Sequence, residues 1–189
     1  MDKLSGKIAL ITGAAVGLGE GIAQVYAKYG AKLCLFDLDP HVEVTAQKLR
    51  DHYHQDIISF IGDVSNRQDL EEAVTLTLEK FGSLDIACCN AGICRLAPFD
   101  QMSDQIRDQH IDVNIKGVWN SCQASLKPML KQGYGSIVIA SSVTGDLVAD
   151  AGEAAYAMTK SALVGLTKAL AVEYAHKNIR INCTQLGYA

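Results

Sequence analysis

Short apolar runs alternate with longer amphipathic segments along the whole chain. The apolar runs are bounded by Gly, Asp, Asn or Ser, which is typical of strands that are buried on both faces. The predicted strands are Lys7–Thr12, Lys32–Asp37, Ile57–Ile61, Leu84–Cys88, Ser136–Ala140 and Arg180–Thr184. The predicted helices are Gly19–Tyr29, Val42–His52, Arg67–Phe81, Asp104–Gln132 and Ala154–His176.

This alternation predicts an α/β fold, with a doubly wound, mostly parallel sheet and helices on both of its faces. Right-handed crossovers favour the strand order 3-2-1-4-5-6 of Rossmann-type folds. Residues placed to cap helices are Ser103 and either Asn66 or Ser65, and glycines placed to end them are Gly30, Gly82 and Gly133. Because neither a repeat nor a linker interrupts the pattern, we expect one domain over residues 1–189.

Composition and charge narrow the function classes. The chain has 189 residues, 49% of them hydrophobic, and a formal net charge of −4. It has no cluster of Lys and Arg residues, and therefore lacks the positively charged surface that is typical of nucleic-acid-binding proteins. The N-terminal sequence shows neither the apolar segment of a signal peptide nor a run of membrane-spanning length. We therefore expect a cytoplasmic protein that binds neither nucleic acid nor membrane.

The cysteines and histidines show no metal-binding spacing. None of the six cysteines forms a C-x-x-C pair and several lie in apolar runs, so we expect buried, reduced thiols. The adjacent Cys88 and Cys89 lie close to the expected cofactor cleft, which leaves inactivating oxidation as an alternative there. The histidines, expected on solvated helices or loops, are His41, His52, His54, His110 and His176. The sequence therefore predicts no metal site.

Three glycines follow the first predicted strand and open the first predicted helix. Gly13, Gly17 and Gly19 suit a tight turn, a close approach of the backbone to a pyrophosphate, and a helix N-terminus with free N–H groups. A glycine triplet alone is weak evidence, because ordinary turns also use glycine. Here strand, turn and helix occur in the required order, which favours a dinucleotide-binding loop.

Two aspartates follow the second and third predicted strands. A carboxylate at Asp37 can accept hydrogen bonds from the adenosine ribose and would repel a 2′-phosphate, so we expect NAD rather than NADP. Its alternative role is to begin the turn before Asp39 and Pro40. Asp63 is placed to contact the adenine end of the cofactor, and initiation of the next helix is an equally good interpretation.

Tyr156 and Lys160 form the candidate acid–base pair. A tyrosine has a pKa of about 10, too high for a proton shuttle near neutral pH. A lysine four residues later lies on the same helix face, and its charge is expected to lower that pKa. A hydroxyl at Ser142 would donate a hydrogen bond to the substrate oxygen. Together with a dinucleotide loop, this pair predicts a nicotinamide-dependent oxidoreductase.

Six motifs, in this order and at these approximate spacings, resemble the short-chain dehydrogenase/reductase family over nearly the whole chain. They are Thr12-Gly13-Ala14-Ala15-Val16-Gly17-Leu18-Gly19, Asp63-Val64, Asn90-Ala91-Gly92, Asn114-Ile115-Lys116-Gly117, Ser141-Ser142 and Tyr156-Ala157-Met158-Thr159-Lys160. Each motif alone is modest evidence, but jointly they are highly specific. The resemblance implies hydride transfer between NAD and a secondary alcohol or ketone, in a homodimer or homotetramer.

The resemblance also implies roles for individual residues. Tyr156 would be the general acid/base, Lys160 its activator, Ser142 the carbonyl partner, and Asn114 part of a proton relay. Asn114 has an alternative role as a polar residue that bends its helix. The implied cofactor-binding residues are Gly13, Val16, Gly17, Leu18, Gly19, Asp37, Asp63, Val64, Asn90, Ala91, Gly92, Tyr156, Lys160 and Gly187.

The chain departs from the family pattern near its end. Leu186-Gly187 stands where the family has a Pro-Gly pair beside the nicotinamide, so this turn is expected to be looser. Full-length members continue with a threonine-bearing segment, a helical lid and a seventh strand. We therefore expect a domain that is incomplete at its C-terminus and whose seventh strand is absent.

Three other functions compete with an NAD-dependent alcohol dehydrogenase. The missing lid would suit a truncated, non-catalytic NAD-binding module, although the intact Ser, Tyr and Lys argue against it. An NADPH-dependent ketone reductase of the 3-oxoacyl type is a second alternative. A methyltransferase also has a glycine-rich loop and an acid after its second strand, but the spacing from Thr12 to Gly13 and the pair Tyr156 and Lys160 argue against one.

Overall fold

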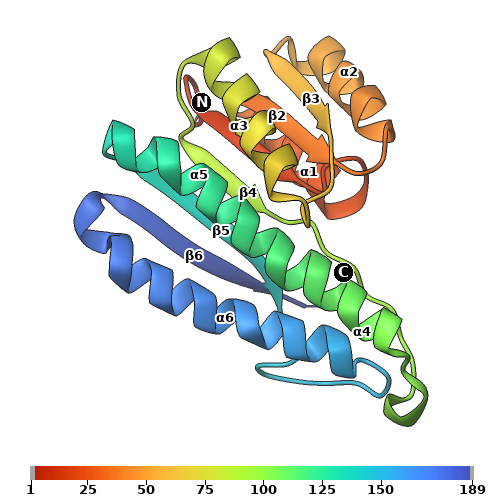
Figure 1. Ribbon diagram of the computed structural model, residues 1–189. Helices are drawn as coiled ribbons and strands as arrows, with labels where there is room; N and C mark the ends of the chain where they lie inside the picture. Colours follow the sequence, from red (N-terminus) through yellow and green to blue (C-terminus); the bar gives the residue numbers. More distant parts are fainter. Residues whose placement is uncertain (1–2, 188–189) are drawn as a thin grey trace.

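The computed structural model describes residues 3–187, and its elements follow the predicted alternation (Figure 1). The strands are β1 (Ile8–Thr12), β2 (Lys32–Asp37), β3 (Ile57–Ile61), β4 (Ile86–Cys89), β5 (Gly135–Ser142) and β6 (Ile179–Leu186). The α-helices are α1 (Gly17–Lys28), α2 (His41–Tyr53), α3 (Arg67–Phe81), α4 (Asp104–His110), α5 (Val118–Gln132) and α6 (Ala154–Tyr174). Shorter helical segments are η1 (Phe99–Gln101), η2 (Ile111–Gly117) and η3 (Ala175–Lys177).

The six strands form one sheet in the order β3-β2-β1-β4-β5-β6. Every neighbouring pair is parallel. The predicted doubly wound sheet and its strand order are therefore confirmed. Within residues 3–187 there is no seventh strand, and β6 lies at one edge of the sheet.

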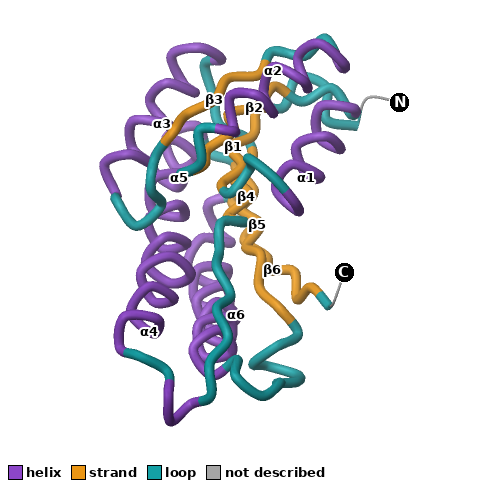
Figure 2. The backbone as a smooth tube through the Cα atoms, turned by 90° about the vertical axis from the view of Figure 1, so that its right-hand side faces the viewer, coloured by secondary structure: helices purple, strands orange, loops and turns teal. Residues whose placement is uncertain are grey.

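The sheet is covered by helices on both faces (Figure 2). Side chains alternate along a strand, so Ala9 and Ile11 of β1 pack in one cluster with residues of α1 and α2. The intervening Leu10 packs in a second cluster with residues of α3, α5 and α6. All five residues of β1 are buried, which explains why this strand is a continuous apolar run rather than an alternating one.

The helix predicted over Asp104–Gln132 is interrupted, and this prediction was wrong in detail. α4 and α5 are separated by η2, a π-helical segment that contains Asn114. Single π-helical turns within longer helices are rare and are frequent at functional sites. A Cβ atom at Gly117 would lie 2.6 Å from Val64 Cγ2, so glycine allows η2 to approach the loop after β3 closely.

The predicted helix ends are mostly confirmed. Asn66 caps α3 by accepting a hydrogen bond from the N–H of Gln68, and Ser103 caps α4 in the same way through Ile106. The residues that end α3 and α5 in the left-handed conformation are Gly82 and Gly133. α1 ends one residue earlier than predicted, at Lys28, with Tyr29 as its C-cap and Gly30 beyond it.

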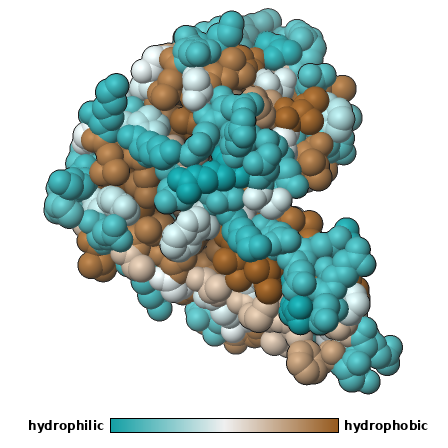
Figure 3. Space-filling view, viewed as in Figure 1, coloured by the Kyte–Doolittle hydropathy of each residue, from teal (hydrophilic) through white to brown (hydrophobic). Residues whose placement is uncertain are grey.

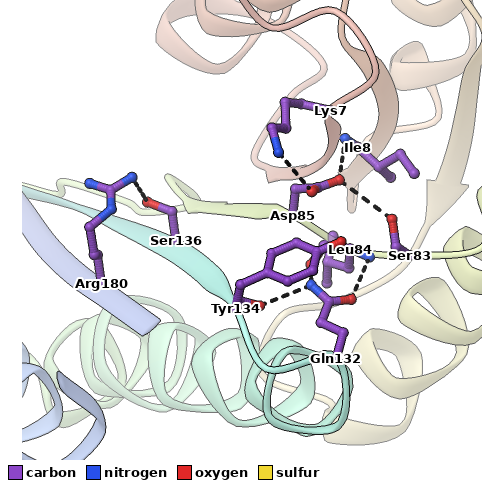
Figure 4. A network of polar contacts seen from close by, with 9 residues as sticks. All are labelled: Lys7, Ile8, Ser83, Leu84, Asp85, Gln132, Tyr134, Ser136 and Arg180. Atoms are coloured by element: carbon purple, nitrogen blue, oxygen red, sulfur yellow. Dashed lines mark hydrogen bonds and ion pairs between the residues drawn. The ribbon is translucent and has the colours of Figure 1, made fainter. Parts of the chain in front are cut away.

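A polar network joins the amino ends of the central strands (Figure 4). The buried carboxylate of Asp85 accepts a hydrogen bond of 2.9 Å from the N–H of Ile8 and contacts the Lys7 ammonium at 3.4 Å. The Gln132 side chain donates to the carbonyl oxygens of Leu84 and Tyr134, at 2.7 and 3.0 Å. β4 begins at Ile86 rather than at the predicted Leu84.

We predict that Asp85→Ala lowers the free energy of unfolding by about 1–3 kcal/mol, because the Ile8 N–H would lose its buried acceptor. Urea unfolding followed by circular dichroism measures this loss. Asp56→Ala is the control, since it removes only an exposed ion pair with Lys32 (2.7 Å) and should cost less than about 1 kcal/mol. Equal losses in the two variants would contradict the structural role of Asp85.

Candidate active site

A hydrogen-bond cluster holds the carboxyl ends of β1 and β4 together. The side-chain amide of Asn90 donates to the carbonyl oxygens of Thr12 and Gly13, at 3.1 Å each. The Thr12 hydroxyl in turn accepts from the backbone N–H groups of Asn90 and Ala91, at 3.1 and 3.2 Å. These strands lie at the point where the strand order reverses, which is where doubly wound sheets bind their ligands.

A groove of about 590 Å³ opens at this point. Figure 3 shows that the molecular surface is indented at its right-hand side. In Figure 1, which has the same orientation, the strands run towards this side. Predicted site residues that line the groove are Gly13, Val16, Leu18, Gly19, Asp37, Asp63, Val64, Asn90, Ala91 and Gly92. Lining residues that sequence reasoning missed are Phe36, Leu38, Asp39, Gly62, Ile93 and Val113. Most of these residues are next to a predicted site residue in the sequence, so the motifs could have indicated them.

The glycines at the start of α1 fit the approach of a phosphate group. Cβ atoms at Gly13 and Gly19 would collide with the Ala91 backbone (2.8 Å) and with the Gly13 carbonyl group respectively. A Cβ at Gly17 would meet nothing within 4 Å, but its φ of +64° favours glycine. No side chain caps the first turn of α1 at Val16, so its N–H groups remain available to an anion.

Asp37 lies where a ribose-binding acid is expected. One carboxylate oxygen accepts a hydrogen bond from the N–H of Ala15 (2.8 Å), and the other accepts from the N–H of Asp39 (3.0 Å). The carboxylate therefore ties β2 to the glycine loop and also forms the turn that the alternative interpretation assigned to it. A carboxylate has about four lone-pair positions, and these two bonds use only two of them. Asp37 can therefore still accept hydrogen bonds from a ligand in the groove.

Asp63 begins the turn into α3, as one interpretation of its position predicted, and its contact with the adenine end of the cofactor stays a prediction. It lines the groove, and its carboxylate accepts a hydrogen bond from the N–H of Ser65 (2.8 Å), just before α3. Its own N–H donates to Asp69 of α3 at 2.8 Å. The residues proposed for the adenine end are thus held rigidly by the start of a helix.

Ser142, Tyr156 and Lys160 come together where β5 and α6 meet. The buried Lys160 ammonium donates to the carbonyl oxygen of Ala140 at 2.8 Å and lies 5.5 Å from the centroid of the Tyr156 ring. The Ser142 hydroxyl accepts from the N–H of Thr144 at 3.0 Å. By contrast, the Ser141 hydroxyl faces α6 and donates to the Lys160 carbonyl at 2.9 Å, which leaves Ser142 as the serine beside Tyr156.

The protonation equilibria differ from the expectation that Lys160 lowers the pKa of Tyr156. Burial raises the pKa of Tyr156, and hydrogen bonding with Ser142 opposes this only in part. Burial also lowers the pKa of Lys160 to about 8. Burial is the main cause of both shifts, and the Lys160 ammonium is directed to the Ala140 carbonyl.

Asn114 fastens the loop after β4 to α6. Its carboxamide accepts from the N–H of Ile93 (2.8 Å) and donates to the Ile93 carbonyl (2.9 Å) and to the Thr159 hydroxyl (3.0 Å). A Cβ at Gly92 would lie 3.3 Å from Asn114 Oδ1 and 3.4 Å from Lys160 Nζ. Gly92, which lines the groove, is therefore a neighbour of Lys160, whereas the predicted cofactor-binding residues Gly17, Tyr156 and Lys160 are not part of the groove lining.

Two predicted features lie differently from expectation. β6 continues through Leu186, and Gly187, the last described residue, is exposed and absent from the groove lining; a turn that continues beyond Gly187 lies outside the described residues. His110, predicted to be solvated, is fully buried. Its Nδ1 bonds to the Ile106 carbonyl (2.8 Å) and its Nε2 accepts from the N–H of Arg95 (3.0 Å). The sequence pattern could not predict these contacts of His110, because both of its partners are backbone groups.

Cys34, Cys88, Cys89 and Cys122 are buried as predicted, whereas Cys94 is exposed, so the expectation of buried thiols was wrong for this residue. Burial raises the pKa of Cys88 to about 11, and a contact with Cys122 (3.9 Å between sulfurs) raises that of Cys89 further above its ordinary value. Protonated, inaccessible thiols react slowly, which disfavours the oxidation alternative. Among residues 3–187, no group of His, Cys, Asp and Glu could hold a metal ion, and no helix is long and apolar enough to cross a membrane.

Comparison with known proteins identifies the family. The short chain dehydrogenase family model matches residues 7–189. Oxidoreductase UcpA of Escherichia coli is 52% identical over 188 residues, covering 100% of this chain and 71% of UcpA. A 3-oxoacyl-[acyl-carrier-protein] reductase of Thermotoga maritima is 35% identical, covering 98% of this chain and 75% of the reductase.

A solved structure agrees with these sequence matches. The crystal structure of NAD⁺-bound xylitol dehydrogenase superposes with a TM-score of 0.94 at 28% identity, covering 98% of this chain and 72% of that protein. The fold, the motifs and the relatives agree. The chain belongs to the short-chain dehydrogenase family, whose members are oxidoreductases that bind a nicotinamide cofactor.

Proposed function

We propose that this protein is an NAD-dependent oxidoreductase that interconverts a secondary alcohol and the corresponding ketone. The observation that carries the proposal is that Lys160 lies beside both Gly92, which lines the groove, and the Tyr156 ring. A groove that fits a dinucleotide thus ends at a group that can exchange a proton. The family membership removes the methyltransferase alternative.

The groove residues fit the cofactor that the family binds. The uncapped start of α1 would hold the pyrophosphate, Asp37 the adenosine ribose, and Asp63 with Val64 the adenine end. Asn90, Ala91 and Gly92 form the wall on the side of β4. When bound, a nicotinamide supplies the hydride acceptor or donor of the reaction.

The chain's own residues supply proton transfer and charge stabilisation. In alcohol oxidation, the Tyr156 oxygen would accept the proton of the substrate hydroxyl, and in ketone reduction it would return one. The Ser142 hydroxyl would donate a hydrogen bond to the substrate oxygen, where negative charge develops. The Lys160 ammonium would stabilise the tyrosinate, and Asn114 would keep the loop after β4 and the lysine in place.

Preference for NAD over NADP rests on charge. Asp37 faces the groove, and a 2′-phosphate beside its carboxylate would be repelled. Among the groove-lining residues there is no Lys or Arg to neutralise such a phosphate. The relationship to a 3-oxoacyl reductase at 35% identity supports ketone reduction as the second candidate direction, with the same residues acting in reverse.

Assembly of this single domain as a homodimer or homotetramer is part of the proposal. Trp119 of α5 and Val172 of α6 are large apolar side chains that are 53% and 81% exposed. Both helices cover the same face of the sheet. Apolar side chains in such positions are commonly covered when a second subunit binds.

We predict that Tyr156→Phe lowers kcat/KM by about 10²–10⁴-fold, because the variant lacks the proton-transferring oxygen. NADH affinity, measured by titration calorimetry, should change little. The control is Tyr174→Phe, since Tyr174 lies on the same helix but near its far end. Full turnover by Tyr156→Phe would contradict the assigned role.

We predict that Asp37→Asn shifts the ratio of NADPH to NADH affinity towards NADPH by about tenfold or more, because it removes one negative charge near the ribose. Asparagine keeps an oxygen that can accept the hydrogen bond from Ala15, so the loop should remain folded. Asp51→Asn, on the exposed end of α2, is the matched control. A wild-type protein that binds NADPH as tightly as NADH would refute the proposed selectivity.

A further inference from the structure

The segment 62–66 connects β3 to α3 and contributes part of the groove wall (Figure 1). Gly62, Asp63 and Val64 line the groove. A local hydrogen bond shapes this turn, because the Asp63 carboxylate accepts from the N–H of Ser65 at 2.8 Å. Such a bond fixes the form of the turn, but it does not fix the position of the turn relative to the rest of the groove.

The start of α5 supplies that connection. The side-chain amide of Asn120 donates to the carbonyl oxygens of Val64 and Ser65, at 3.0 and 3.2 Å. The bonded residues are 56 and 55 positions apart in the sequence. A Cβ atom at Gly117 would lie 2.6 Å from Val64 Cγ2. Glycine at position 117 therefore permits the close approach, and Asn120 holds it.

The pattern of bonds specifies the residue type at position 120. A side-chain amide has two N–H donors, and here both are used by carbonyl groups of consecutive residues. A carboxylate or an apolar side chain of the same shape has no donor to offer. With either of these in place, the two carbonyl groups would lose their partners and the turn would lose its attachment to α5.

The helical segment around Asn120 also contacts other parts of the groove. Val113 of η2 lines the groove directly. Asn114, the next residue, bonds to both backbone groups of Ile93, a second lining residue in the loop after β4. Asn120 does the equivalent for Val64 in the loop after β3. One continuous helical segment thus holds lining residues from two loops in fixed positions.

We propose that Asn120 is a positioning residue for cofactor binding, which holds Val64 where it packs against the adenine ring. This inference rests on the proposed function, which assigns the adenine end of the groove to Asp63 and Val64. Asn120 is not part of the groove lining, so its effect passes through the backbone of Val64. An apolar contact with a purine exists only within about 4.5 Å, and a small displacement of the turn therefore removes it.

The test is the binding of ADP-ribose to the full chain, measured by titration calorimetry. ADP-ribose carries the adenine, its ribose and the pyrophosphate but no nicotinamide, so its affinity reports on this part of the site without turnover. We expect Asn120→Leu, which keeps the side-chain shape without the donors, to raise the Kd of ADP-ribose by about five- to tenfold. In turnover, the change should lie in the KM for NAD⁺ rather than in kcat.

The matched control is Gln132→Met. Gln132 also donates to two backbone carbonyl groups, those of Leu84 and Tyr134, but it does so at the amino ends of the strands (Figure 4). Both variants lose two amide hydrogen bonds, so both should unfold at a lower urea concentration. Only Asn120→Leu should weaken the binding of ADP-ribose. If Asn120→Leu does not fold, the smaller Asn120→Ala takes its place with the same expected loss.

A double-mutant cycle tests whether Asn120 acts through Val64. Val64→Ala alone should weaken the binding of ADP-ribose, because it removes the apolar contact. Adding Asn120→Leu to this variant should then cost less affinity than it costs in the wild-type protein, since the contact that Asn120 positions is already absent. Additive losses would show that Asn120 does not act through Val64.

Three outcomes overturn the inference. The first is an unchanged affinity for ADP-ribose in a folded Asn120 variant, and the second is an equal loss of affinity in Gln132→Met. The third is additivity in the cycle with Val64→Ala. A wild-type protein that binds neither ADP-ribose nor NADH, by contrast, contradicts the proposed function itself, so the two failures are distinguishable.

Discussion

The hydrogen bonds of Asn90 are the constraint on which the site depends. They close the gap between β1 and β4, where the connections of a doubly wound sheet depart in opposite directions and leave carbonyl groups without strand partners. Because Asn90 satisfies the Thr12 and Gly13 carbonyls, the glycine turn can stay close to the strand ends. A larger side chain at Gly13 would strike Ala91, so the same contacts that complete the sheet also shape the groove.

The buried lysine connects this groove to the chemistry. Lys160 lies in a mostly apolar helix, and its ammonium is tied to the Ala140 carbonyl at the end of β5. Burial depresses its pKa to about 8, so it is still largely charged at neutral pH. The site therefore keeps a desolvated positive charge next to a tyrosine that burial holds in its protonated form. Under the proposed function, proton transfer takes place beside Gly92, where the groove ends.

Sequence pattern was sufficient for the sheet order and for most of the groove, because strand periodicity and glycine spacing are local signals. It did not predict the π-helical segment around Asn114, whose geometry depends on contacts with Ile93 and Thr159 far along the chain. The same holds for the buried His110, which bonds to a distant backbone N–H. The pKa of Tyr156 was expected to fall and instead rises, since residue spacing carries no information on burial.

The central claim is that the groove and the pair Tyr156 and Lys160 form one active site. The most direct measurement is an NMR titration of ¹³C-labelled tyrosine, with the Tyr156 signal assigned from the spectrum of Tyr156→Phe. Without cofactor, Tyr156 should titrate above the ordinary value of about 10. With saturating NAD⁺ its pKa should fall, because the positive nicotinamide ring would favour the tyrosinate. An unchanged pKa in the presence of bound NAD⁺ would contradict the account.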